Sequence, residues 1–262
     1  MRNDVGEIPE ELFCAKANDY QRWRSGYPSN IINVLSTHIR FGRDWVVAEI
    51  GSGTGIFSEI LVQAGNRVFA VEPNADMRHA AEARLADQTG FISVAGSAEA
   101  TGLAAGSIDL IVSAQSFHYF DPPRARAEFD RLLTPRGTAL VLWNAFDQDM
   151  ASYDDFLALQ RQHAAKPDLV RRRNFARDER LEEFFAPEGF EYWVIRHHQS
   201  LDLEGLEGLL FSLSYMPGRD DPQAEALRHA AAAFFARYAE DGRYRLSYQL
   251  QCHLWRRGVS SR

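Results

Sequence analysis

The chain has 262 residues, of which 45% are hydrophobic and 25% are charged, and its formal net charge is −7. This composition is ordinary for a folded globular protein and excludes a disordered or fibrous chain. The negative charge argues against nucleic acid as a partner, because binding to phosphate backbones depends on many Lys and Arg contacts.

The two cysteines, Cys14 and Cys252, are too few for a disulfide framework or a cysteine metal site, which fits a reducing compartment. Charged residues interrupt the N-terminal sequence where a signal peptide needs an apolar stretch, and no long apolar run occurs elsewhere. We therefore expect a cytoplasmic protein without a membrane span.

The first half of the chain predicts alternating strands and helices. A helix is expected to begin at Pro28, since proline suits a first helical turn, and to continue to Ile39. From Trp45 to Asn144, short apolar runs alternate with helical stretches, which is typical of βαβ units and a mainly parallel sheet. The expected strands are WVVAEI (45–50), RVFAV (67–71), FISVAG (91–96), IDLIVSA (108–114) and GTALVLWN (137–144).

The second half predicts two further strands, within residues 188–200 and 244–256. In the latter, RLSYQLQCHLW alternates strictly and predicts a half-solvated strand at or near a sheet edge. Its solvated side would carry Ser247, Gln249, Gln251 and His253.

Helical segments are expected in residues 150–187 and 201–243. The second segment is far longer than a hairpin connection needs, which predicts a helical cap over the carboxyl ends of the strands, with Phe211, Tyr215 and Met216 as an apolar wall. The first contains a basic run from Arg171 to Arg173 that suits a carboxylate, although such runs are more often solvated.

Together these elements predict one Rossmann-like α/β domain over residues 1–262: a seven-stranded, mainly parallel sheet with helices on both faces and a helical cap insertion.

The most informative motif is VAEIGSGTGIFSEIL, in which an expected strand ends before a glycine loop and a helix. Glycines allow a sharp turn and the close approach of a ligand. The dinucleotide fingerprint requires glycine at its sixth position, but Ile56 stands there and the third glycine comes earlier, at Gly55. About twenty residues further on, Glu72 follows the next strand, where Rossmann-type folds present an acid to ribose hydroxyls.

Further informative stretches are AEIGSGTG (48–55), AVEPNADM (70–77), GSAEATGLAAGSIDLIVSAQSFHYFD (96–121) and RLLTPRGTALVLWN (131–144), and, more weakly, YQRWRSGYP (20–28). In these stretches the sequence resembles the class I S-adenosylmethionine-dependent methyltransferases. Within them it resembles the small-molecule branch of the trans-aconitate and ubiquinone-pathway methyltransferases. The resemblance implies S-adenosyl-L-methionine as cofactor and a small-molecule methyl acceptor.

The resemblance also implies roles for individual residues. Those expected at the methionine moiety are Glu49, Gly51, Ser52, Gly53, Gly55 and Gln115. Glu72 would hold the ribose, and the residues expected around adenine are Pro73, Met77, Ser97, Ala98 and Glu99. Many relatives have an aspartate directly after the third strand, which is missing here; Glu99 is the candidate replacement. Within residues 1–44, Tyr20 and Arg24 would form a lid.

His118 follows the fourth strand, where an open α/β sheet faces its ligand. It is the candidate catalytic base, although a packing role is the ordinary alternative. Two other function classes stay open: a nicotinamide-dependent oxidoreductase and a non-catalytic cofactor-binding module. No metal site is expected, because His197 and His198 have no companion ligands at suitable spacing.

Overall fold

The computed structural model describes residues 22–170 and 179–258, so Tyr20 and the Arg171–Arg173 run lie outside the described residues. The chain divides into two compact units. We call the unit made of Gly26–Asn144, Asn174–Ile195 and Leu250–Arg262 the core unit. The remainder, Met1–Ser25, Ala145–Arg173 and Arg196–Gln249, is the helical unit.

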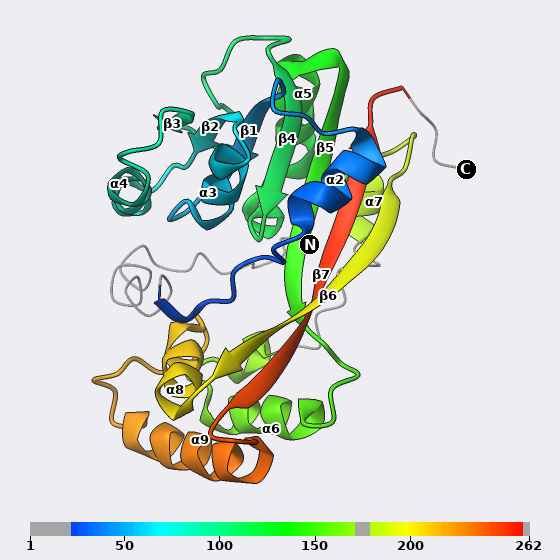
Figure 1. Cartoon of the computed structure of the whole chain (residues 1–262). Coiled ribbons are helices and arrows are strands. Elements are labelled where there is room, and N and C mark those ends of the chain that lie inside the picture. Colours follow the sequence, from blue (N-terminus) through cyan, green and yellow to red (C-terminus); the bar gives the residue numbers. More distant parts are fainter. Residues whose placement is uncertain (1–21, 171–178, 259–262) are drawn as a thin grey trace. The chain divides into compact units, whose positions relative to one another are not determined.

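A seven-stranded sheet in the order β3-β2-β1-β4-β5-β7-β6 organises the fold (Figure 1). The pairs β1–β2, β2–β3, β1–β4 and β4–β5 are parallel, so the predicted α/β class is confirmed. The strands are β1 (Val46–Ile50), β2 (Arg67–Val71), β3 (Phe91–Val94), β4 (Ile108–Ala114), β5 (Leu133–Phe146), β6 (Glu191–Leu201) and β7 (Tyr244–Arg256).

Strand β7 runs antiparallel to β5. The Thr138 hydroxyl, early in β5, donates to the carbonyl of Trp255, late in β7. Just beyond the other end of β5, the Asp147 amide donates to the carbonyl of Ser247, near the start of β7, at 2.9 Å. Early residues of one strand therefore meet late residues of the other, and the sheet is mixed but mainly parallel.

Helices cover both faces of the sheet in the core unit (Figure 1). Val47 packs with α2 and α3, whereas its neighbour Ala48 packs with α5 and α7, because successive strand residues point to opposite faces. The helices are α2 (Ile31–Ile39), α3 (Ile56–Gln63), α5 (Pro122–Leu132) and α7 (Glu179–Phe184); α4 (Ala75–Arg84) contacts β3.

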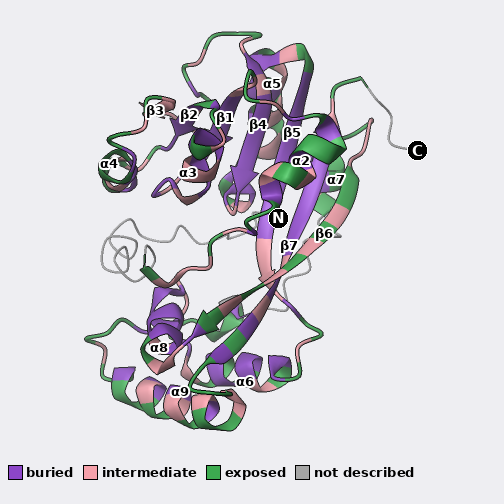
Figure 2. Cartoon of the chain, viewed as in Figure 1, coloured by how far each residue is buried: buried purple, intermediate pink, exposed green. Residues whose placement is uncertain are grey.

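The prediction of a half-solvated β7 is wrong for its second half. Gln251 and His253 are buried, at 4% and 0% exposure. Strand β7 lies between β5 and β6, and the His253 ring packs against the rings of Trp143 and Tyr192. Exposed and half-buried residues alternate instead along β6, the edge strand, which Figure 2 shows as largely exposed and intermediate.

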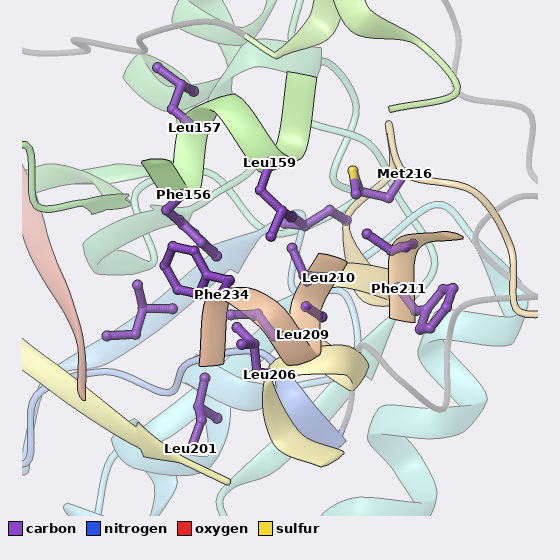
Figure 3. Close-up of a cluster of buried hydrophobic side chains, with 14 of the residues drawn as sticks. Phe156, Leu157, Leu159, Leu201, Leu206, Leu209, Leu210, Phe211, Met216 and Phe234 are labelled. Atoms are coloured by element: carbon purple, nitrogen blue, oxygen red, sulfur yellow. The ribbon is translucent and has the colours of Figure 1, made fainter. Parts of the chain in front are cut away.

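The helical unit contains α6 (Tyr153–His163), α8 (Leu203–Ser212) and α9 (Ala224–Tyr238), so both helical stretches expected in 201–243 are present. Their apolar faces form one buried cluster, part of which Figure 3 shows. It includes Phe156, Leu159, Leu206, Leu210, Met216 and Phe234. That these helices cap a ligand site stays a prediction. Among the described residues, no helix is long and apolar enough to cross a lipid bilayer.

One packing contact in the helical unit requires a glycine. A Cβ on Gly208 of α8 would come within 2.1 Å of Cδ1 of the Trp23 indole. The indole therefore occupies the space that a side chain would need.

We predict that Gly208→Ala destabilises the protein. The displaced indole costs about 1–3 kcal/mol, which exceeds the roughly 1 kcal/mol that alanine contributes as a better helix former. Thermal unfolding and the tryptophan emission maximum measure the effect. Gly218→Ala is the control, since nothing lies within 4 Å of that position. Equal melting temperatures for Gly208→Ala and the wild type would contradict the packing.

Candidate functional site

The candidate site lies at the carboxyl ends of three neighbouring strands of the core unit. The glycine loop follows β1, Glu72 follows β2 and Gln115 follows β4. Because β1 lies between β2 and β4, these residues meet at one edge of the sheet. Chain order also reverses between β1 and β4, which is where open α/β sheets bind ligands.

The glycines of the loop serve different purposes, although all three have positive φ angles. A Cβ on Gly51 would lie 2.5 Å from Cβ of Ser116, and one on Gly55 would lie 3.1 Å from Cβ of Ala81. These two glycines bring parts of the protein close together. Nothing lies within 4 Å of the corresponding position at Gly53, whose φ is +54°. Gly53 is therefore the glycine that leaves room for a ligand.

Glu72 ties the glycine loop to the turn after β2. Its Oε2 accepts a hydrogen bond from the Gly53 amide at 2.9 Å, and its Oε1 accepts one from the Asn74 amide at 3.0 Å. Arg78 donates to the carbonyls of Glu72 and Pro73, which holds the same turn. A carboxylate offers about four acceptor positions, so Glu72 retains capacity for a ligand hydroxyl.

Glu49 is a buried acid beside this carboxylate, with 1% of its surface exposed. The pKa of Glu49 is raised to about 8, chiefly by burial; the negative charge of Glu72 contributes to the rise, and a hydrogen bond from the Ser58 hydroxyl opposes it. Glu49 therefore holds a proton at neutral pH until a cation approaches. An ammonium group on a ligand is such a cation.

The segment after β3 carries the expected adenine contacts. Ala98 is buried, the Glu99 amide donates to the Ser97 hydroxyl at 3.3 Å, and Oε1 of Glu99 accepts from the Asp121 amide at 2.9 Å. One oxygen of Glu99 is thus engaged at the start of α5. Met77, which is also expected near adenine, is buried in the first turn of α4.

Glu128 of α5 holds this segment in place, and the sequence analysis did not identify it. It accepts hydrogen bonds from the amide and hydroxyl of Thr101, at 3.0 and 2.6 Å, and from Arg131 at 2.7 Å. Arg131 also donates to the carbonyl of Leu103 at 2.8 Å. These bonds, led by the one from Arg131, lower the pKa of Glu128 to about 2.

We predict that Glu128→Gln removes stability at neutral pH but not at low pH. The folded pKa lies below the ordinary 4.5, so the stabilisation by ionised Glu128 is complete above about pH 4.5 and is lost as pH falls towards 2. Urea unfolding at several pH values measures the difference between variant and wild type. The exposed Glu82→Gln is the control. A Glu128→Gln difference that stays constant between pH 3 and 7 would overturn this assignment.

A tight turn follows β4 and contains the candidate base. Gln115 has a φ of +66°, unusual for a residue other than glycine, and His118 lies in the short helix η1 (Phe117–Tyr119). Arg180 of α7 donates to the carbonyls of Phe120 and His118, at 2.8 and 3.3 Å. Unusual backbone conformations such as that of Gln115 cluster at functional sites. Arg180, distant in sequence, was not among the predicted site residues.

The remaining predicted residues belong to the helical unit. Arg24 donates to the carbonyl of Ser212, at the end of α8, at 3.4 Å. Phe211 and Met216 are buried in the core of this unit, with 1% and 2% of their surface exposed. Tyr215 donates a hydrogen bond to Gln160. Among the described residues, no group of three or more His, Cys, Asp or Glu side chains could hold a metal ion.

The strand order, the glycine loop and the acids at the switch point are those of an open α/β sheet with a candidate ligand site where the strand order reverses. Residues 48–141 match the family described as methyltransferase domain. A nicotinamide-dependent oxidoreductase is not favoured by this match.

Two relatives and one solved structure illustrate what this chain is similar to. An uncharacterized methyltransferase of Mycobacterium bovis is 33% identical over 52% of this chain and 53% of its own length, so the chain spans about half of that relative. An uncharacterized methyltransferase-like protein of Schizosaccharomyces pombe is 25% identical over 93% of this chain and 94% of its own length. A solved structure from Anaeromyxobacter dehalogenans, described as a "putative type II methyltransferase", shares the fold with a TM-score of 0.64 at 22% identity, covering 89% of this chain and 97% of that chain.

Proposed function

We propose that the protein transfers a methyl group from S-adenosylmethionine to an oxygen or nitrogen of a small molecule, with a carboxylic acid as the first candidate acceptor. The observation that carries the proposal is the Gly53 backbone, which faces open space while its amide is fixed by Glu72. The cytoplasmic location expected from the sequence stays a prediction.

The residues at the switch point fit this cofactor. Glu72 has acceptor capacity for the ribose diol, and the buried Glu49 would be stabilised as an anion by the ammonium of the methionine moiety. Met77 and Ala98 are buried apolar groups in the two segments expected to contact adenine. Pro73 is exposed at the turn, so it would contact the purine from the solvent side.

The cofactor supplies a methyl group already activated by its sulfonium, so the protein chiefly has to position the acceptor and exclude water. The acceptor's lone pair forms the new bond to carbon, and the carbon–sulfur electron pair stays on sulfur. A carboxylate is already ionised at neutral pH and needs no base. A hydroxyl or ammonium acceptor would have to give up a proton, for which His118 is the candidate.

We predict that Glu72→Gln weakens S-adenosylhomocysteine binding by about 10- to 100-fold, the equivalent of a lost charge-assisted hydrogen bond of about 1.5–3 kcal/mol. The amide can still accept from Gly53, so the fold should survive. Calorimetric titration measures the affinity, and exposed Glu82→Gln is the control. Unchanged affinity in a folded Glu72→Gln variant would remove this residue from the site.

We also predict that binding releases close to one proton at pH 7. The free protein holds Glu49 protonated, since its pKa is about 8, and the ligand ammonium would favour the ionised form. Titration with S-adenosylhomocysteine in buffers of different ionisation enthalpy measures the release, which should disappear above about pH 9 and in Glu49→Gln. Binding of this ligand without proton release in the wild type would show that its ammonium does not ionise Glu49.

Transfer of a labelled methyl group to members of a metabolite panel separates an enzyme from a non-catalytic cofactor-binding module. A protein that binds S-adenosylhomocysteine yet transfers nothing to any carboxylate, phenol or amine of the panel would favour the module.

A further inference from the structure

A serine hydroxyl joins the turn after β4 to the end of β1. Strands β1 and β4 lie side by side (Figure 1), and their paired register ends at Glu49 and Val112. Beyond that pair, the hydroxyl of Ser116 donates to the carbonyl of Ile50 at 2.6 Å, and Ser116 is buried. This hydrogen bond therefore continues the connection between the two strands into the loops that follow them.

A second serine fixes the direction of this hydrogen bond. The Oγ atoms of Ser113 and Ser116 lie 2.8 Å apart, and Ser113 is fully buried in β4. A hydroxyl has one proton to donate, and Ser116 gives its proton to the carbonyl of Ile50, so Ser113 is the donor to Ser116. The two hydroxyls thus form a chain of hydrogen bonds that runs from β4 to the end of β1.

Ser116 also packs against the first glycine of the loop after β1. A Cβ on Gly51 would lie 2.5 Å from Cβ and 2.8 Å from Oγ of Ser116. The amide of Gly51 donates to the carbonyl of Val71 at 2.8 Å, which ties this glycine to the end of β2. Gly51 is therefore held between β2 and Ser116 at a distance that excludes a side chain.

The residue before this serine, Gln115, has an unusual conformation. Its φ is +66°, a region that few residues other than glycine adopt, and its amide donates to the carbonyl of Leu142 at 2.9 Å. On the other side, the amide of Tyr119 donates to the carbonyl of Ser116 at 2.9 Å, which closes the turn that contains His118. The bonds made by Leu142 and Ser116 therefore hold Gln115 from both sides.

We propose that Ser116 is a positioning residue for the methionine moiety of S-adenosylmethionine. It acts through Ile50 and Gln115: its hydroxyl keeps the glycine loop and the turn after β4 at a fixed separation on either side of that moiety. A small displacement of positioning groups is enough to impair binding and transfer. The proposal rests on the proposed methyltransferase function, which assigns Glu49 and Gln115 to the methionine moiety, and all of these residues belong to the core unit.

Two variants test the role of this hydroxyl. Ser116→Ala removes the hydroxyl and keeps a small side chain. Ser113→Ala leaves the bond to Ile50 in place but removes the group that orients it, and it serves as the second variant in case Ser116→Ala fails to fold. Ser107→Ala is the matched control, because the hydroxyl of Ser107 also donates to a backbone carbonyl, that of Ala104 at 2.7 Å, but stands before β4 begins. Thermal unfolding checks that each variant folds.

The probes are S-adenosylhomocysteine and methylthioadenosine, which keeps the nucleoside and the sulfur but lacks the amino and carboxylate groups. In calorimetric titration of the full-length protein, we expect Ser116→Ala to weaken S-adenosylhomocysteine binding about five- to tenfold, the equivalent of one lost hydrogen bond. Its affinity for methylthioadenosine should stay as in the wild type. Ser113→Ala should show a smaller loss with the same selectivity, and Ser107→Ala none.

Hydrogen exchange measured by mass spectrometry is the second readout, and it decides alone should methylthioadenosine bind too weakly for calorimetry. At saturating S-adenosylhomocysteine, we expect exchange in residues 113–121 to slow in the wild type and in Ser107→Ala, but less in Ser116→Ala. Residues 67–73, which contain β2 and Glu72, should be protected equally in all three proteins, because the ribose contact does not depend on Ser116.

The proposal is overturned if folded Ser116→Ala binds S-adenosylhomocysteine as the wild type does, if it loses affinity for both probes alike, or if residues 113–121 are protected equally in variant and wild type. Each of these results leaves the proposed function standing and removes Ser116 alone. A wild type that does not bind S-adenosylhomocysteine overturns the proposed function, and the positioning role with it.

Discussion

The hydrogen bond from the Gly53 amide to the Glu72 carboxylate is the contact on which the arrangement of the core site depends. It joins the loop after β1 to the turn after β2, two neighbouring strands whose carboxyl ends meet at the switch point. The same carboxylate accepts from Asn74, so the turn cannot shift without moving the loop. Its charge also raises the pKa of buried Glu49, and the two acids thereby favour a ligand with a hydroxyl pair and a cation.

Much of the fold could be predicted from the sequence because its signals are local. Strands β2 and β4 coincide with the apolar runs 67–71 and 108–114. Strand β5 extends beyond the expected 137–144, because pairing with neighbours carries residues of low apolar content into the sheet. The burial of Gln251 and His253 could not be predicted, since it depends on which strands lie beside β7 and not on the alternation within it.

The candidate site likewise contains some residues that could be predicted from the sequence and others that could not. The glycine loop and Glu72 stand in one short stretch with a recognisable spacing, so the sequence indicated them directly. Glu128 and Arg180 act through contacts with residues 27 and 60 positions away, respectively, at Thr101 and Phe120. No periodicity or motif signals such contacts. Tyr215, predicted as part of an apolar wall, lies in the turn after α8, and its hydroxyl donates a hydrogen bond to Gln160 of α6, a contact that the sequence does not indicate.

The most direct test of the central claim is a calorimetric titration of the full-length protein with S-adenosylhomocysteine and, separately, with NAD, repeated for Gly53→Val. A β-branched side chain at Gly53 would fill the open space in front of the loop and resist its positive φ. The account predicts that the wild type binds S-adenosylhomocysteine and not NAD, and that the folded Gly53→Val variant binds neither. Binding of NAD in preference to S-adenosylhomocysteine, or undiminished binding of the latter by Gly53→Val, would contradict it.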